Sequence, residues 1–322
     1  MGETAYNSAE NHFGTQKILE LQANNHTAQL GVYRMGAQVF LCRIDGEDIL
    51  LPRSNPRGLS EHVVDALGNT SIDSTGEGGT FPAYQFGRAE GQPIHGYAPI
   101  NTWRVVEESP QSVTLVTGGE NQINFAKAFH DDVISMERTL GIKADIHNHP
   151  HFQFTTTAIN HHPRNTVQIN YFNSPDMAEH FYIAGNANVA TVLVAGKQIP
   201  LSTFRQKGVH VVTKEPVSYL NHGDIPSNQL EEQPGLMLIF PDGPEGRVVV
   251  MQSLVTITSQ TGEILDMFSP KEYTAYQKPG SEKSFCIEPQ TGSHVLTNGD
   301  RMILAIDVTM YNSFAEFAEI QK

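Results

Sequence analysis

Short runs rich in Val, Ile, Thr, Phe and Tyr recur along most of the chain, separated by segments that contain Gly and Pro. These residue types suit the pleated, half-buried surface of a β-sheet, and runs of this length are typical of strands. The runs expected to form strands are residues 112–116, 134–140, 152–159, 167–172, 189–194, 209–212, 236–240, 247–257 and 302–310. Helical periodicity is confined to two short segments, residues 60–66 and 313–320. The pattern predicts an all-β protein.

The domain organisation follows from how evenly this pattern continues. The apolar alternation begins after Thr27 and reads as a β-meander, broken at Gly36-Ala37 and ending in an Asp45-Gly46 turn. The 27 glycines and 18 prolines are spread along all 322 residues, and no linker divides them. We therefore expect a polar N-terminal segment, residues 1–26, and a single domain, residues 27–322. That domain is expected to be a large antiparallel β-sandwich whose curved sheets leave a concave groove.

Charge and cysteine usage exclude several classes of function. The net charge of −14 disfavours nucleic acid and anionic membranes as partners, because both require clustered Lys and Arg. No apolar stretch approaches the roughly 20 residues of a membrane helix, and the N-terminus has no signal-peptide pattern. Cys42 and Cys286 lie far apart in apolar runs and are expected to be free thiols. These features indicate a cytoplasmic protein.

Three features of expected loops lie in the first third of the chain. The pair Gly78-Gly79 lacks the Lys-Ser/Thr of a phosphate loop, so a turn is favoured over nucleotide binding. Arg88 can donate several hydrogen bonds to vicinal hydroxyls, although for a single arginine a surface loop position is favoured. His95 lies between a proline-led turn and Gly96, where a small ligand could approach closely.

Glu288 lies inside an apolar strand, directly before Pro289. Burying a carboxylate is costly, so Glu288 is either paired or held ready for proton transfer. Proline ends ladder pairing locally and can direct neighbouring side chains into an opening. A functional and a structural role are equally favoured by this pattern alone.

Three histidines, His147, His149 and His151, alternate along one segment and would share one face of a strand. Alternate residues of a strand stand about 6–7 Å apart, too far for one tetrahedral zinc ion with bonds of about 2.0 Å unless the chain bends. A polar sheet face or loop is therefore favoured over a metal site. Further along, Asn160 and Asn170-Tyr171 combine amides with an aromatic ring, which suits sugar binding and equally suits a strand end.

Taken in order, these motifs resemble the aldose 1-epimerase (galactose mutarotase-like) superfamily. The matching pieces are the Gly-Ala meander, a Gly-Gly…Phe-Pro…Phe-Gly segment at residues 78–87 and a His-Gly-Tyr-Ala…Trp motif at residues 95–103. A strand ending in Asn, a Tyr-Phe-Asn segment at residues 171–173 and Ile-Glu-Pro at residues 287–289 complete the series, over about residues 28–310. The motifs are nearest to the hexose-6-phosphate epimerase-like branch.

The resemblance implies a β-supersandwich whose concave face binds a sugar, and an isomerase that interconverts sugar anomers without a cofactor. Glu288 would be the general base at the anomeric hydroxyl, and a histidine would be the acid at the ring oxygen. His95 matches one of the two active-site histidines of the family. Side chains expected to bind the sugar are Arg88, Asn170, Tyr171, Asp224 and Gln290.

The sequence departs from the family pattern at two places. The family has a second histidine two residues before its Tyr-Phe segment, where this chain has Ile169, which cannot donate a proton. Either His95 replaces that acid, or the protein is a non-catalytic carbohydrate-binding protein. Where arginines would be expected for a sugar phosphate, this chain has Glu77 and Pro99. A neutral sugar is therefore the expected ligand.

Overall fold

The expected β-rich runs form strands in a computed structural model that describes residues 16–53, 62–64, 70–72, 78–84, 98, 103–118, 134–161, 177–194, 197–201, 220–226, 236–240, 246–270, 272–277, 283–292, 294 and 296–320. Every expected run overlaps a strand except residues 167–172 and 209–212, which lie outside these ranges. The expected helix at the end of the chain is confirmed as α1, Phe314–Ile320. The prediction of an all-β protein is confirmed.

Two large antiparallel sheets contain nearly all of the described strands. In the described ranges the first sheet has nine strands, ordered β1-β2-β3-β7-β12-β20-β19-β15, with β4 paired to β3. Its strands are β1 (Gln16–Ala23), β2 (His26–Tyr33), β3 (Val39–Ile44), β4 (Glu47–Asp48), β7 (Thr80–Tyr84), β12 (Met177–Ala184), β15 (Leu220–Pro226), β19 (Glu272–Gln277) and β20 (Ser284–Gln290).

The second sheet has ten strands in the same ranges, ordered β14-β13-β16-β17-β21-β11-β10-β9-β8, with β18 paired to β17. Its strands are β8 (Arg104–Glu108), β9 (Ser112–Gly118), β10 (Ile134–Ala144), β11 (Pro150–Asn160), β13 (Thr191–Val194), β14 (Lys197–Pro200), β16 (Leu236–Phe240), β17 (Arg247–Thr258), β18 (Ile264–Phe268) and β21 (Arg301–Tyr311). A separate pair joins β5 (His62–Val64) to β6 (Thr70–Ile72).

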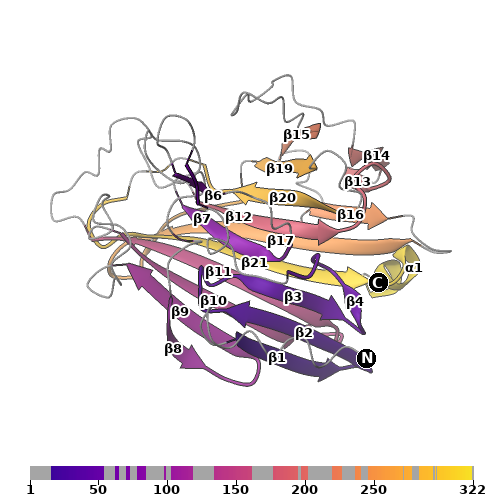
Figure 1. The fold of residues 1–322 in the computed structure, drawn as a ribbon, viewed down its shortest axis with the longest axis horizontal. Helices are drawn as coiled ribbons and strands as arrows, with labels where there is room; N and C mark the ends of the chain where they lie inside the picture. The colour runs from indigo at the N-terminus through magenta and orange to yellow at the C-terminus, as the bar shows by residue number, and fades with distance from the viewer. Residues whose placement is uncertain are drawn as a thin grey trace.

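The hydrophobic core lies between the two sheets (Figure 1). Phe181 of β12 and Phe154 of β11 meet across it with ring centroids 5.1 Å apart and nearly perpendicular planes. Both rings are fully buried, as are most inward residues of the central strands. The shared apolar layer makes the two sheets a sandwich, as the sequence pattern predicts.

Two expectations about local structure were wrong. Residues 60–66 were expected to be helical, but β5 occupies residues 62–64, because His62-Val63-Val64 pairs as a strand with β6. The first strand begins at Gln16 and not after Thr27: β1 lies within the segment 1–26 and pairs along its whole length with β2. The sheet therefore includes part of the segment that was expected to precede the domain.

Candidate functional site

Three neighbouring strands of the first sheet, β7, β12 and β20, bring a histidine and a glutamate side by side. The register pairs Phe81 of β7 with His180 of β12. On the other side of β12, Ala178 pairs with Gln290 and Phe181 with Ile287, a register that sets His180 opposite Glu288 of β20. Because side chains alternate along a strand, His180 and Glu288 share the sheet face that points away from the sandwich core.

The two side chains are in direct contact. Nδ1 of His180 lies 3.0 Å from Oε1 of Glu288, and both residues are almost completely buried. The ring of Phe81 stacks on the His180 imidazole with centroids 4.6 Å apart and planes within 8°. Sγ of Cys286 lies 3.8 Å from the same Nδ1 atom. A carboxylate that can accept a proton and an imidazole that can donate one are therefore held against each other.

The opposite face of β12 is anchored to the second sheet by a buried ion pair. The Glu179 carboxylate accepts hydrogen bonds from the Arg138 guanidinium of β10 and from the Thr80 hydroxyl of β7. Burial raises the pKa of Glu179, and Arg138 and Thr80 oppose that shift. Since Thr80 precedes Phe81 and Glu179 precedes His180, these inward contacts fix the strands that carry the outward pair.

The Gly78-Gly79 pair is a turn that leads into β7, as expected from the sequence. Gly79 has a positive φ of 66°, and a Cβ atom there would lie 1.8 Å from the carbonyl oxygen of Val39. Its amide donates to Leu51 O, and its carbonyl accepts from the Tyr182 amide at 3.0 Å. Only glycine fits this close approach, which sets β7 beside β12.

The structure describes some of the predicted site residues. Glu288 lies in the His180 contact, and Gln290 is buried two residues further along the same strand face. Asp224 lies in β15 at the edge of the same sheet. The candidates His95, Arg88, Asn170 and Tyr171 fall outside the described residues, as do Ile169, Glu77 and Pro99. The predicted approach of His95 to Glu288 therefore stays a prediction.

His180 is the site residue that the sequence analysis missed. It lies in a strand whose residues are buried on both faces, so the run Met177–Ala184 shows no apolar-polar alternation. The available signal was local, because His180 precedes the aromatic pair Phe181-Tyr182. The family's histidine before its Tyr-Phe segment instead corresponds in the sequence comparison to Ile169.

The three alternate histidines do not form one metal site. His147 is exposed in the turn between β10 and β11, and its backbone amide donates to Asp145. His149 is buried and stacks on Tyr311, with centroids 4.6 Å apart. His151 lies between Asp307, at 2.5 Å, and Asp145, at 3.3 Å. As expected, the segment is a turn and a polar strand face.

Asn160 has a structural role at its strand end, where its side-chain amide donates to the Leu296 carbonyl at 2.8 Å.

Donor atoms that could hold a metal meet at two places in the described residues. One is His180, Cys286 and Glu288, whose donor atoms all lie within 4.8 Å of one another. The other is His26, His149 and Glu316, whose donor atoms also lie within 4.8 Å of one another.

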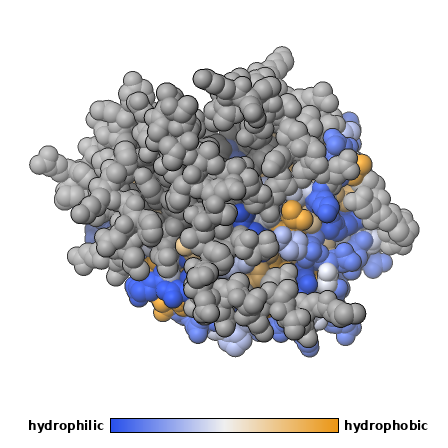
Figure 2. All heavy atoms as spheres, in the orientation of Figure 1, coloured by the Kyte–Doolittle hydropathy of each residue, from blue (hydrophilic) through white to orange (hydrophobic). Residues whose placement is uncertain are grey.

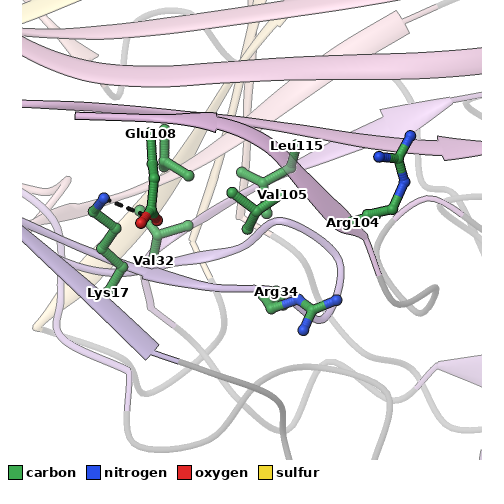
Figure 3. Close-up of a pocket in the computed structure, with 8 residues that line it drawn as sticks. Lys17, Val32, Arg34, Arg104, Val105, Glu108 and Leu115 are labelled. Carbon is green, nitrogen blue, oxygen red and sulfur yellow. Dashed lines mark hydrogen bonds and ion pairs between the residues drawn. The ribbon is translucent and has the colours of Figure 1, made fainter.

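A cavity of about 480 Å³ lies at a different place, between β1 and β2 at the edge of one sheet and β8 and β9 at the edge of the other (Figure 3). Lys17 and Glu108 both line it and form an ion pair at 3.1 Å. Apolar side chains and two arginines complete the lining: Val32, Arg34, Arg104, Val105, Val113 and Leu115. Among these described lining residues there is no imidazole beside a carboxylate, so acid–base chemistry is better supported at Glu288.

Three solved structures with this architecture are distant from this chain in sequence. A putative aldose 1-epimerase from Escherichia coli K12 is 14% identical, covers 92% of this chain and 99% of its own, and has a TM-score of 0.54. A galactose mutarotase related enzyme from Lactobacillus acidophilus is 10% identical, with coverages of 94% and 99% and a TM-score of 0.51. A galactose mutarotase-like protein from Lactobacillus casei is 11% identical, with coverages of 92% and 100% and a TM-score of 0.50.

These similarities show that the chain has the galactose mutarotase-like β-sandwich fold, as the motif resemblance implied. No protein-family model matches the sequence, and no curated protein sequence matches it. In the described part of the chain, no helix is long and apolar enough to cross a membrane.

Proposed function

We propose that the protein is an aldose 1-epimerase-like isomerase that interconverts the anomers of a neutral sugar. The observation that carries the proposal is the buried contact of 3.0 Å between His180 and Glu288, on the outward face of a sheet of this fold. Proteins of the same fold are described as aldose 1-epimerase or galactose mutarotase-like, which supports a carbohydrate as the ligand.

In the proposed reaction, Glu288 accepts the proton of the anomeric hydroxyl while an imidazolium donates a proton to the ring oxygen. The bond between the anomeric carbon and the ring oxygen breaks, and an open-chain aldehyde forms. After rotation about the bond between C1 and C2, Glu288 returns its proton to the aldehyde oxygen, and the imidazole takes back the proton of the hydroxyl that the ring oxygen became. That oxygen attacks the other face of C1, and the ring closes. The exchange is balanced between one acid and one base, so it requires no cofactor.

We assign His180 as the acid, because its imidazole is already in contact with the base, and we keep His95 as a residue that binds the sugar or shares the acid role. The two described side chains packed against the pair, Phe81 and Cys286, are uncharged. Their lack of charge supports a neutral sugar over a sugar phosphate. Cys42 and Cys286 are buried and are not in a disulfide, which is in keeping with a cytoplasmic location.

The test follows the anomers of freshly dissolved α-glucose and α-galactose by NMR or optical rotation. Glu288→Gln keeps the shape of the side chain but cannot accept the proton, so we expect a rate about 10²–10⁴-fold lower. His180→Asn should cost a similar factor. The control Glu137→Gln makes the same chemical change at an exposed position of β10 and should keep the wild-type rate.

If calorimetry shows that the wild-type protein binds these sugars and NMR shows no acceleration of mutarotation, the result would support the alternative of a non-catalytic carbohydrate-binding protein. Glu288→Gln with an unchanged rate would show that another group is the base. Clearly tighter binding of glucose 6-phosphate than of glucose would contradict the neutral ligand.

A further inference from the structure

A second group of metal-ligand side chains lies apart from His180 and Glu288, at the end of the molecule where α1 lies (Figure 1). His26 begins β2, His149 ends the turn between β10 and β11, and Glu316 lies in the first turn of α1. These three residues are 123 and 167 positions apart along the chain, yet one donor atom of each lies within 4.8 Å of the others. Such convergence from three separate elements is what a ligand site requires.

His26 is oriented by a carboxylate. Its Nδ1 lies 2.6 Å from Oδ2 of Asp45, whose other oxygen accepts the amide of Thr27 at 2.7 Å. Since a carboxylate accepts, Nδ1 carries the proton and Nε2 keeps its lone pair in the neutral ring. Nε2 lies 3.8 Å from Oε1 of Glu316. A carboxylate behind a histidine is the usual arrangement for a histidine that ligates a metal.

His149 is oriented by a backbone carbonyl. Its Nε2 donates to Met310 O at 3.0 Å, so Nδ1 keeps the lone pair. Its ring centroid lies 5.0 Å from that of His26, and the two ring planes are inclined at 72°. The two imidazoles are therefore neighbours, although they come from different turns of the chain.

Glu316 is oriented by its own helix. Its Oε2 accepts the amide of Asn312 at 2.7 Å, and its amide donates to the Ser313 hydroxyl at 3.0 Å. This reciprocal capping box holds the side chain at the start of α1 and leaves Oε1 toward His26. Each of the three candidate ligands thus has a contact that fixes its orientation, and one donor atom of each lies within 4.8 Å of the others.

We propose that His26, His149 and Glu316 form a binding site for a divalent transition metal of the Zn²⁺ class. Two imidazoles with one carboxylate select such ions over Mg²⁺ and Ca²⁺, which prefer oxygen ligands. Ligand atoms around a tetrahedral ion with bonds of about 2.0–2.1 Å lie about 3.4 Å apart, so the side chains must close inward on binding. His26 and Glu316 are partly exposed, which lets the ion enter and leaves a position for water.

The proposed site takes only His149 from the three alternating histidines His147, His149 and His151. His147 and His151 are not ligands in it, because His147 points into an exposed turn and both nitrogens of His151 face Asp307 and Asp145. The proposal is independent of the sugar chemistry, since neither His180 nor Glu288 takes part.

The test uses the full chain, freed of metal with a chelator, and titrates it with Zn²⁺ by calorimetry and with Co²⁺ by visible absorption. We expect one ion per chain. Glu316→Gln keeps the capping contact but removes the charged ligand, and His26→Asn removes an imidazole, so each should weaken binding at least about 10-fold. Asp45→Asn, which changes only the contact behind His26, should weaken it by about 10–100-fold.

His147→Asn is the matched control, because it removes an exposed histidine two residues from His149 and should leave the affinity unchanged. Zn²⁺ should also raise the melting temperature of the wild type and not that of the double variant His26→Asn/Glu316→Gln. Equal affinity in the wild type and the double variant would overturn the proposal. Loss of binding in Cys286→Ser, with binding retained in His26→Asn, would also overturn it, because the ion would then bind at the other group.

Discussion

At the scale of single residues, the outward face of the second sheet carries a chain of charged contacts that depends on ionised carboxylates. Asp307 of β21 accepts hydrogen bonds from His151, at 2.5 Å, and from Lys143, at 2.9 Å. Desolvation opposes the ionisation of Asp307, but the contacts with His151 and Lys143 outweigh it and lower the pKa of the carboxyl. The folded state therefore favours the charged form of this side chain.

Asp307 should make the stability of the protein depend on pH. Because its folded pKa lies below the unfolded value of about 3.9, its contribution is complete above that value and is lost as pH falls through the folded pKa. At neutral pH we expect Asp307→Asn to lower the free energy of unfolding by about 1–3 kcal/mol, the range for hydrogen bonds to charged groups. Urea unfolding between pH 7 and pH 3 measures the difference.

The difference between wild type and Asp307→Asn should shrink as the pH falls through the folded pKa of Asp307, because the wild-type carboxyl is then protonated too. Asp266→Asn is the control, because Asp266 is exposed on β18 and the same change there should have little effect. A difference that stays constant across the pH range would show that Asp307 contributes through packing and not through its charge.

At the scale of elements, β12 connects the core to the candidate site. Its inward side chains Glu179 and Phe181 contact the second sheet, and its outward side chain His180 contacts Glu288. The ion pair of Glu179 with Arg138 has no exposure to solvent that could screen either charge. The position of the outward pair therefore depends on whether this inward pair is intact.

Arg138→Met should be strongly destabilising, because it leaves the Glu179 carboxylate buried without its partner. We expect a loss of about 3–5 kcal/mol in the free energy of unfolding. The double variant Arg138→Met/Glu179→Leu replaces both charges with apolar groups and should recover most of that loss. Denaturant unfolding of the two variants and the wild type measures both effects. A double variant no more stable than Arg138→Met would show that the unpaired Glu179 carboxylate is not what destabilises the single variant.

At the scale of the whole molecule, one apolar layer is shared by both sheets, and its inward residues come from strands far apart in the sequence. On the face shown in Figure 2, hydrophilic side chains make up much of the described surface along the lower and right-hand edges, and smaller hydrophobic spots lie among them. Since neither sheet can bury its apolar face alone, we expect the two sheets to unfold together.

Substitutions in either sheet should shift the same thermal transition. Phe154→Leu in the second sheet and Phe181→Leu in the first should each lower the stability by about 1–3 kcal/mol. Because the rings contact each other, the effects in the double variant should not be additive. Differential scanning calorimetry should give one transition for all three proteins, and two transitions that respond separately would contradict a single domain.

The sequence by itself determined the class of fold. The run Arg247–Thr258 and the run Arg301–Tyr311 are rich in β-branched residues, and their strand character follows from local preference and alternation. The turn at Gly78-Gly79 could also be predicted from the sequence, because glycine readily adopts the positive φ that Gly79 has in the structure. The single carboxylate in an apolar strand pointed to Glu288 because burying a charge has a high energetic cost.

Only the tertiary structure decided which residues meet. His180 lies 108 positions before Glu288, and no local pattern states that β12 and β20 are neighbours. The same holds for His26, His149 and Glu316, and for Arg138 and Glu179. Side-chain periodicity reports which face of a strand is buried, whereas strand order depends on the packing of the whole chain, so pairings across sheets and between distant turns are set by the complete fold.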